Sequence, residues 1–433
     1  MKTGGASFES LSRGDILRVR TFAGEMHGEF IEYRKESGLL VLKLKSGYDI
    51  VLPSKEISAV NVLERAKREG GKKGEISEST GGKGDITIIT TGGTISSKID
   101  YETGGVSPSV PPDYYLQLAP DMKRYGSVAI MGLMKMLSEN MQPADWVRIA
   151  KAAYDAVKGG SKGIMVTMGT DTMHFASAAV SFMLNPLSVP VVFTGSQRSP
   201  DRGSTDASSN LLLSAITASK WDGAESVICM HANTNDDYNF VLRGNRARKM
   251  HTERRDAFRP INSLPLARVF PDGRIDKVSD YTRRSGESVL NAKIDDRVKM
   301  LLSYPSMGGD IIDYYIDKKA RGIVIAGTGF GNLPLEDKSV YKALKRADGA
   351  GIPVVITSQT VYGSTNRFVY STLRELSRLD NVIYVGDTLT ETAFVKLMFV
   401  LGQGKKMEEV RSLMTKSLAG EMSDRSPLEG FLI

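Results

Sequence analysis

The stretch DITIITTGGTISSK, residues 85–98, holds an apolar run that ends at two glycines with a threonine on either side. β-Branched residues dominate positions 86–90, which predicts a buried strand, and Gly92 and Gly93 end that strand abruptly. Because glycine has no side chain, something small can lie directly against the backbone of this turn. The stretch therefore predicts a buried strand that leads into a functional turn.

Similar apolar runs follow along the chain and alternate with helical patterns. They are SVAIMGL at 127–133, GIMVTM at 163–168, VPVVFTG at 189–195 and SVICMH at 226–231. Residues 145–160, DWVRIAKAAYDAVKGG, have apolar positions at helical spacing and end on glycines, as expected of a crossover helix. Repeated units of this kind predict a mostly parallel sheet with helices on both faces. The alternation restarts after a charged stretch, which predicts a first α/β domain at 85–294 and a smaller one at 295–433.

The N-terminal part has a different spacing of apolar and polar residues. Residues 8–64 alternate apolar and polar positions in five short bursts, which predicts five strands in a small SH3-like β-barrel. We interpret residues 1–64 as a docking domain, because they are poor in aromatic residues and hold no catalytic cluster. Glycine, lysine and glutamate dominate residues 65–84, which is typical of a linker.

The composition excludes several classes of protein. The chain has 433 residues, of which 41% are hydrophobic, but no run of about eighteen apolar residues that could cross a membrane. The N-terminus lacks the apolar segment of a signal peptide, so we expect a cytoplasmic protein without membrane contact. The single cysteine, Cys229, excludes an internal disulfide, and the four histidines lack the spacing of a structural metal site. The net charge of +7 permits an anionic partner without requiring one.

Three predicted strands end in turns that combine glycines with hydroxyl side chains. These turns are TTGGTI at 90–95, TMGTDTM at 167–173 and FTGSQRSP at 193–200. In open α/β sheets, ligands bind beyond the carboxyl ends of the strands, so we expect the turns to line a site. The sequence has no GxxxxGK[ST] motif, and no GxGxxG opens a helix at the first turn. GTGFGN at 327–332 resembles the dinucleotide fingerprint only in part, because Asn332 replaces its last glycine.

Thr170 and Asp171 admit two interpretations. Either residue could be the N-cap of the helix that follows, where its side chain would accept a bond from a free backbone N–H. Alternatively, the Thr170 hydroxyl beside a carboxylate is half of an activated nucleophile, which needs a base to take its proton. A lysine whose pKa is lowered by burial or by a neighbouring cation could be that base, but spacing alone selects no particular lysine.

Two motifs carry a resemblance to a known family. TGGTI at 91–95 and GTDTM at 169–173, each at the end of a strand, resemble the signatures of the bacterial-type L-asparaginase and glutaminase family. YETGGV, LSENM and RARKMH stand in the order that this family requires. The resemblance covers about residues 85–433. It implies two α/β domains of asparaginase type with mostly parallel sheets.

The resemblance also implies catalytic roles. Thr94 would be the nucleophile that carries an acyl-enzyme intermediate, and Tyr101 would assist it from a mobile segment. Thr170, Asp171 and Lys249 would form a second group, in which the lysine activates a threonine or a water and the aspartate holds the lysine. The comparison leaves open which threonine attacks first, and we favour Thr94 as the acyl carrier.

Substrate binding is implied by the same resemblance. Ser138 and Glu139 match positions that grip the α-carboxylate and α-amino groups of the substrate, and Asn332 matches a position that contributes to the site of a neighbouring subunit in a homodimer. The substrate-binding positions are Tyr101, Ser138, Glu139, Gly93 and Gly169. Met168 stands where many relatives carry histidine, which we expect to affect specificity rather than chemistry.

The full-length pattern resembles a narrower family, the D subunits of archaeal glutamyl-tRNA(Gln) amidotransferases. Glutamine would be hydrolysed here, and the ammonia would pass to a partner E subunit that binds Glu-tRNA(Gln) and amidates it. ATP and Mg²⁺ would be used by that partner, so no cofactor is expected in this chain, which would form a homodimer core within a heterotetramer. One alternative is a free-standing L-asparaginase or glutaminase with an accessory barrel, and another is an adaptor with an inactive site.

Other conspicuous residues receive plainer interpretations. The stretch 241–260, rich in arginine, invites a role in phosphate contact, but we favour a solvated loop or a subunit contact. His174 follows the GTDTM motif and is interpreted as a satisfied structural histidine rather than as a general base. Cys229 lies within a predicted strand and is interpreted as a small buried apolar residue.

Overall fold

The computed structural model describes most of the chain. The described residues are 8–12, 14–44, 49–65, 84–99, 106–108, 114–200, 202, 204–425 and 427–431. Tyr101 and most of the predicted linker at 65–84 lie outside these ranges. Within the described ranges, no helix is both long enough and apolar enough to cross a membrane.

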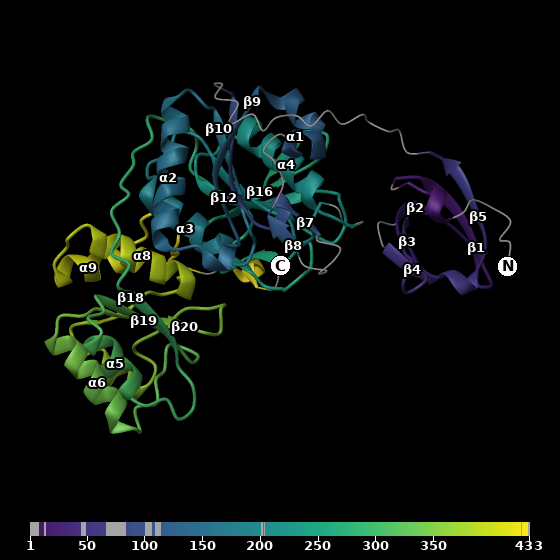
Figure 1. Cartoon of the computed structure of the whole chain (residues 1–433). Helices are drawn as coiled ribbons and strands as arrows, with labels where there is room; N and C mark the ends of the chain where they lie inside the picture. Colours follow the sequence, from purple (N-terminus) through teal and green to yellow (C-terminus); the bar gives the residue numbers. More distant parts are fainter. Residues whose placement is uncertain are drawn as a thin grey trace.

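The N-terminal part forms the predicted five strands (Figure 1). They are β1 (Ile16–Thr21), β2 (Gly24–Arg34), β3 (Leu39–Leu44), β4 (Asp49–Pro53) and β5 (Ile57–Glu64). They pair antiparallel in the order β4-β3-β2-β1-β5, with a 3₁₀ turn at Ser54–Glu56 before the last strand. Leu17, Val19, Leu40 and Leu42 are fully buried in a small core of their own. This barrel-like domain therefore has its own hydrophobic centre.

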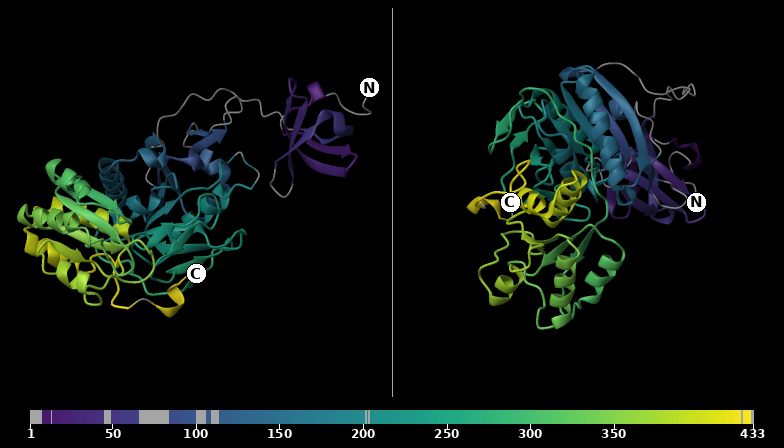
Figure 2. Two further views of the ribbon diagram at one scale, coloured as in Figure 1. Left: turned by 90° about the horizontal axis from the view of Figure 1, so that it is seen from below. Right: turned by 90° about the vertical axis from the view of Figure 1, so that its left-hand side faces the viewer.

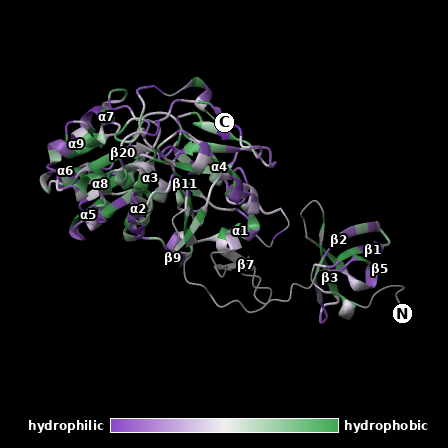
Figure 3. Cartoon of the chain, turned by 90° about the horizontal axis from the view of Figure 1, so that it is seen from above, coloured by the Kyte–Doolittle hydropathy of each residue, from purple (hydrophilic) through white to green (hydrophobic). Residues whose placement is uncertain are grey.

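The largest sheet has eight strands in the order β17-β16-β13-β12-β11-β10-β6-β9. Five strands run parallel, namely β6 (Ile86–Gly92), β9 (Val128–Met136), β10 (Gly163–Thr167), β11 (Val191–Thr194) and β12 (Ser226–His231). The other three extend it antiparallel, namely β13 (Asn239–Arg243), β16 (Ala267–Val269) and β17 (Ile275–Lys277). The parallel strands correspond to the predicted apolar runs, and Figure 3 shows hydrophobic residues concentrated along the strands.

Helices cover both faces of this sheet, as predicted. On one face lie α2 (Pro143–Lys158) and α3 (Met173–Met183), which share a core with Ile164 and Val166 of β10. On the other face lie α1 (Tyr114–Leu118) and α4 (Ala207–Lys220), which share a core with Met165. Alternate residues of β10 thus enter opposite cores, and this explains why the strand is apolar throughout.

Short elements complete the N-terminal α/β part. They are the strand pairs β7 (Ser97–Ile99) with β8 (Val106–Pro108) and β14 (Ala247–Lys249) with β15 (Phe258–Pro260). Three 3₁₀ turns, η3 (Thr94–Ser96), η4 (Pro120–Tyr125) and η5 (Ser138–Asn140), follow or precede strands of the large sheet. Two of them, η3 and η5, contain residues that the sequence assigns to the site.

The C-terminal part is built on a second sheet, which is wholly parallel. Its strands are β18 (Val298–Leu302), β19 (Gly322–Gly327), β20 (Val354–Ser358) and β21 (Val382–Tyr384), in that order. The helices here are α5 (Asp310–Asp317), α6 (Lys338–Gly349), α7 (Ser371–Leu376), α8 (Thr390–Gly402) and α9 (Met407–Met414). Helix α8 packs against both α3 and this sheet, and Figure 2 shows α8 and α9 between the two sheets. One hydrophobic core therefore joins the two α/β parts.

The last residues of the chain cross back to the first α/β part. We call residues 417–423 the C-terminal strap. Within it, Glu421 pairs with Lys396 of α8 (Oε1 to Nζ, 2.7 Å), and both side chains are fully buried. Asn245 donates from Nδ2 to the Ala419 carbonyl (2.8 Å), and Arg246 forms a buried ion pair with Asp387 (2.6 Å). The strap therefore holds the segment that leads into β14.

Candidate active site

Three turns meet at the carboxyl edge of the large sheet. Strands β6, β9 and β10 are neighbours and run parallel, so their ends reach the same edge. The turns that follow them contain residues 93–94, 137–140 and 168–172. This arrangement is the one predicted for ligand-binding turns in an open α/β sheet.

Gly93 and Gly169 bring two of these turns into backbone contact. Gly93 has φ +79°, a conformation that side chains rarely adopt. A Cβ on Gly93 would lie 2.7 Å from the Met168 carbonyl carbon, and still closer to the nitrogen and Cα of Gly169. A Cβ on Gly169 would lie 2.7 Å from the Ser138 hydroxyl. The glycines are therefore required because three backbone turns approach one another here.

Thr170, Asp171 and Lys249 form a hydrogen-bonded group. The Lys249 ammonium donates to Asp171 Oδ1 at 2.7 Å and to Thr170 Oγ1 at 2.9 Å. Thr170 is buried and the Lys249 side chain is only 11% exposed, whereas Asp171 is 64% exposed. Lys249 comes from β14, and the structure thus selects this lysine, which the spacing of residues could not do.

The N-cap interpretation of Thr170 or Asp171 is wrong. Helix α3 begins at Met173 and its N-cap is Thr172, two residues after Thr170. The Thr172 side chain makes no capping bond, and its hydroxyl donates instead to the Ser138 carbonyl at 2.7 Å. Asp171 is consequently free to bind Lys249. The Thr172 bond also ties this turn to the turn that carries Ser138.

The remaining candidate residues lie in the same turns or in the C-terminal part. Thr94 begins η3 and is half-buried, and it directly follows Gly93. Ser138 is buried and Glu139 is exposed, both in η5. Asn332 lies in the turn after β19, where its Nδ2 donates to the Thr328 carbonyl at 3.1 Å. No hydrogen bond joins Asn332 to the other candidates within the described part of the chain.

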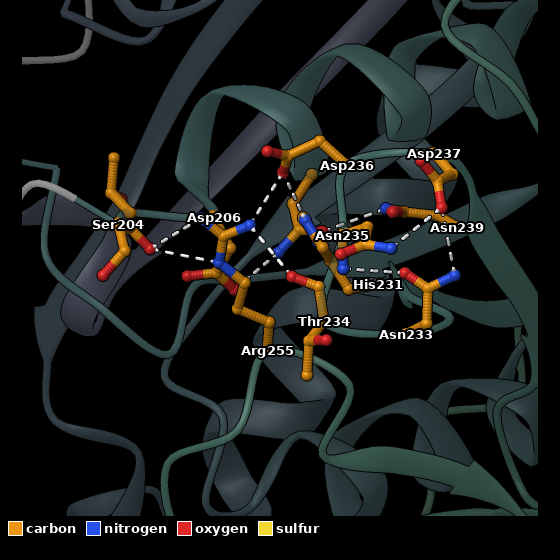
Figure 4. Close-up of polar contacts among 12 residues, drawn as sticks. Ser204, Asp206, His231, Asn233, Thr234, Asn235, Asp236, Asp237, Asn239 and Arg255 are labelled. Atoms are coloured by element: carbon orange, nitrogen blue, oxygen red, sulfur yellow. Dashed lines mark hydrogen bonds and ion pairs between the residues drawn. The ribbon is translucent and has the colours of Figure 1, made fainter. Parts of the chain in front are cut away.

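Sequence reasoning missed the residues that support the catalytic group from the turn after β11. Gln197, in the turn after β11, accepts from the Thr170 hydroxyl at 3.4 Å. The Gln197 backbone N–H donates to the buried carboxylate of Asp206 (3.0 Å to Oδ1). Figure 4 shows the polar network around Asp206, which continues through His231 to Asp236 and Arg255. The FTGSQRSP motif was the only sequence signal for this part of the site.

His174 and Cys229 are buried side chains outside the catalytic group. Burial lowers the pKa of His174 to about 3, with the charges of Arg248 and Lys249 acting in the same direction, so the imidazole is neutral. Its Nδ1 has no hydrogen-bond partner among the described residues, so the expectation of a satisfied histidine is wrong in that respect. Burial raises the pKa of the Cys229 thiol, as expected of a small apolar residue in a strand.

The arginines of the basic stretch 241–260 are paired internally. The pairs are Arg243 with Glu225, Arg246 with Asp387, Arg248 with Glu391, Arg254 and Arg259 with Asp256, and Arg255 with Asp236. Each guanidinium thus already has a carboxylate partner. The stretch is therefore structural rather than a free cationic surface for phosphates.

Comparison with known proteins places the chain in a family. The model "Asparaginase, N-terminal" matches residues 85–281, and the model "Glutaminase/Asparaginase C-terminal domain" matches residues 297–414. The D subunit of the glutamyl-tRNA(Gln) amidotransferase of Pyrococcus abyssi is 40% identical over 435 residues, 98% of each chain. The chain belongs to this family of amidotransferase D subunits. The D subunit of Sulfolobus acidocaldarius is 40% identical over 96% of this chain and 93% of its own.

Solved structures show what this member of the D-subunit family shares with plain asparaginases. The thermostable L-asparaginase from Thermococcus kodakarensis has a TM-score of 0.70 and 28% identity, and the match covers 78% of this chain and 99% of that one. L-asparaginase I from Vibrio cholerae has a TM-score of 0.68 at 28% identity, over 78% and 98% of the two chains. The predicted asparaginase-type α/β fold is thereby confirmed. About a fifth of the chain has no counterpart in those enzymes, whereas the D-subunit relatives match nearly its full length.

Proposed function

We propose that this chain hydrolyses glutamine and supplies the ammonia to an amidotransferase complex. The observation that carries the proposal is the match, over 98% of the chain, to relatives named as D subunits of glutamyl-tRNA(Gln) amidotransferase. The grouping of Lys249 with Thr170 and Asp171 supports an intact hydrolytic site. An adaptor with an inactive site would have no need of this buried lysine.

The proposed reaction begins with attack on the side-chain amide carbon. Thr94 Oγ1 forms the new C–O bond, and its proton passes to the departing nitrogen, so that the C–N bond breaks and ammonia leaves. Water then hydrolyses the acyl-threonine ester and releases glutamate. Lys249 and Thr170 move protons in these steps, and Asp171 holds the lysine in position.

Glycine turns are suited to this chemistry because they expose backbone N–H groups. Such groups stabilise the oxyanion of a tetrahedral intermediate when they point at the developing charge. Gly93 and Gly169 stand immediately before Thr94 and Thr170, and their lack of a side chain lets the turns that carry the two threonines come together. Ser138 and Glu139 are proposed to bind the α-carboxylate and α-amino groups, and Tyr101 to assist Thr94.

The proposed assembly is a homodimer core with a partner E subunit. Phe330 and Tyr370 lie near Asn332 with ring centroids 6.3 Å apart, and they are 42% and 50% exposed. Exposed aromatic side chains next to Asn332 support contact with a second copy, whose site Asn332 would reach. The E subunit would bind Glu-tRNA(Gln) and use ATP and Mg²⁺, and this chain would need no cofactor.

The test is ammonia release from glutamine by the purified chain, with and without the E subunit and Glu-tRNA(Gln). We expect a large increase when the complex is present, and loss of all release in Thr94→Ala because no hydroxyl remains to carry the acyl group. Full activity of the isolated chain would instead favour a free L-asparaginase or glutaminase, as the names of the structural neighbours would suggest. Unchanged release by Thr94→Ala would exclude Thr94 as the nucleophile.

A further inference from the structure

The turn after β11 contacts the catalytic group but has no role in the proposed reaction. We propose that Gln197 is a positioning residue for Thr170, and that a buried chain of Asp206, Asn210 and a doubly protonated His231 holds Gln197 in place. This inference deepens the proposed function and rests on it. It follows from hydrogen-bond roles, which can be assigned by asking which atoms have protons to donate.

The hydroxyl of Thr170 has one proton and two polar neighbours. The Lys249 ammonium can only donate, so Thr170 Oγ1 accepts from it at 2.9 Å. The Thr170 proton then needs another acceptor, and Gln197 Oε1 lies 3.4 Å away. Had the amide been turned round, Nε2 would face an oxygen that already accepts from Lys249. Gln197 therefore fixes the direction of the Thr170 O–H bond in the resting state.

The orientation of the Gln197 amide leaves its own nitrogen without a hydrogen bond. Its Nε2 is buried without a hydrogen-bond partner among the described residues. An unsatisfied buried donor costs about 1–3 kcal/mol, so its presence beside the catalytic group calls for an explanation. The Gln197 amide thus keeps the orientation that suits Thr170 although this orientation costs local stability, as is common at functional positions.

Asp206 anchors the backbone of the turn. Its carboxylate accepts from the backbone N–H groups of Gln197 (3.0 Å) and Arg198 (3.1 Å) and from Asn210 Nδ2 (2.9 Å). Burial raises the pKa of Asp206, but all three partners are donors and therefore favour its carboxylate form. Asn210 Nδ2 also donates to the Gly195 carbonyl at 2.9 Å, at the start of the same turn. Asp206 and Asn210, both fully buried, thus hold the turn at two points.

The two donor contacts of Asn210 Nδ2 also determine the protonation of His231. They leave Asn210 Oδ1 as an acceptor, which receives a bond from Asn239 Nδ2 (2.9 Å) and faces His231 Nδ1 at 2.7 Å. The other ring nitrogen, Nε2, faces Asp236 Oδ1 at 2.9 Å. Both ring nitrogens meet acceptors, so both must carry protons. His231, which is 1% exposed, is therefore an imidazolium.

The imidazolium has a direct charge partner. Asp236 pairs with both His231 and Arg255, and Arg255 also donates from Nε to the Ser204 carbonyl at 3.1 Å (Figure 4). A buried charge is tolerated when it is paired and hydrogen-bonded in this way. The network can therefore act as a rigid support behind Gln197.

The experiment compares ammonia release by Gln197→Met and Gln197→Glu with that of Gln117→Met, a control at an exposed position of α1. Methionine removes the acceptor at similar size, so we expect kcat to fall about tenfold to a hundredfold with KM nearly unchanged. Glutamate keeps an acceptor, so activity should partly return. Its added carboxylate favours the protonated Lys249, so the pH at which activity rises should move upward.

The protonation of His231 is measured independently of activity. With only four histidines in the chain, ¹⁵N NMR of the labelled full chain can resolve each ring, with His231→Gln for assignment. At pH 7 we expect both nitrogens of His231 to carry protons, whereas His174 should show one bare nitrogen. Unchanged kcat and pH profile in Gln197→Met, or a singly protonated His231, would overturn the inference. A wild-type chain that never releases ammonia would instead refute the proposed function, while the NMR result would stand.

Discussion

Replacing Gly93 by alanine tests the contact between the two glycine turns. The new Cβ would lie 2.7 Å from the Met168 carbonyl carbon and closer still to two backbone atoms of Gly169. These neighbours are backbone atoms, so they cannot move aside as the end of a flexible side chain could. The residue would also have to keep φ +79° or the turn would have to change.

The expected loss of stability can be worked from these two effects. Holding alanine in a left-handed conformation costs about 1–2 kcal/mol. Overpacking against immobile neighbours costs about 1–3 kcal/mol. The free energy of unfolding should therefore fall by about 2–5 kcal/mol, a large part of the stability of a typical protein. Because Thr94 and Thr170 each directly follow a glycine of this contact, ammonia release should also fall about a hundredfold.

The assay is denaturant unfolding followed by circular dichroism, with ammonia release measured under conditions where the variant is folded. Gly132→Ala is the matched control, because a Cβ on Gly132 of β9 would meet nothing within 4 Å. The control should change stability by less than about 1 kcal/mol. A Gly93→Ala variant as stable and active as the control would refute the argument that these turns need backbone contact.

Three further predictions concern single side chains. Lys249→Met removes the Nζ that bonds Thr170 and Asp171, so most ammonia release at neutral pH should be lost with little change in the thermal midpoint. Full activity would exclude this lysine as the base. Glu421→Gln leaves the ammonium of Lys396 buried without a charge partner, so the free energy of unfolding in urea should fall by about 3–5 kcal/mol. A loss below about 1 kcal/mol would contradict this. Below its usual pKa of about 6.5, His174 is protonated in the unfolded chain but not in the folded one, so stability should fall as the pH drops from about 6.5 towards 3. His174→Phe should weaken that dependence, which thermal midpoints at pH 7 and 5 would measure.

The fold could be predicted from the sequence where local pattern decides it. Strands such as β6 and β10 are buried on both faces, so a continuous β-branched run identifies each of them. The antiparallel strands β16 and β17 have three residues each, too few for a period to emerge, and were not predicted. The N-cap of α3 was misplaced by one or two residues, because threonine occurs at both 170 and 172 and either could cap a helix.

The site could be predicted only as far as motifs reach. Gly93 and Gly169 each indicate a tight turn from the sequence alone. Their contact with each other depends on the order of the strands in the sheet, which local sequence does not reveal. Lys249 became identifiable through the family resemblance, since it is separated from Thr170 by 79 residues. The roles of His231 and Asp206 could not be predicted, because the members of a buried polar network follow no regular spacing in the sequence. Only the fold brings these side chains into contact.

The C-terminal strap makes the position of the catalytic lysine depend on the fold of the C-terminal part. Asn245 and Arg246, which lead into the strand carrying Lys249, are held by Ala419, Ser423 and Asp387. Lys249 belongs to a short strand of the N-terminal α/β part, yet the segment before it is held by residues that follow β21 in the chain. A substitution that loosens the strap should therefore displace Lys249 and lower activity before the large sheet unfolds.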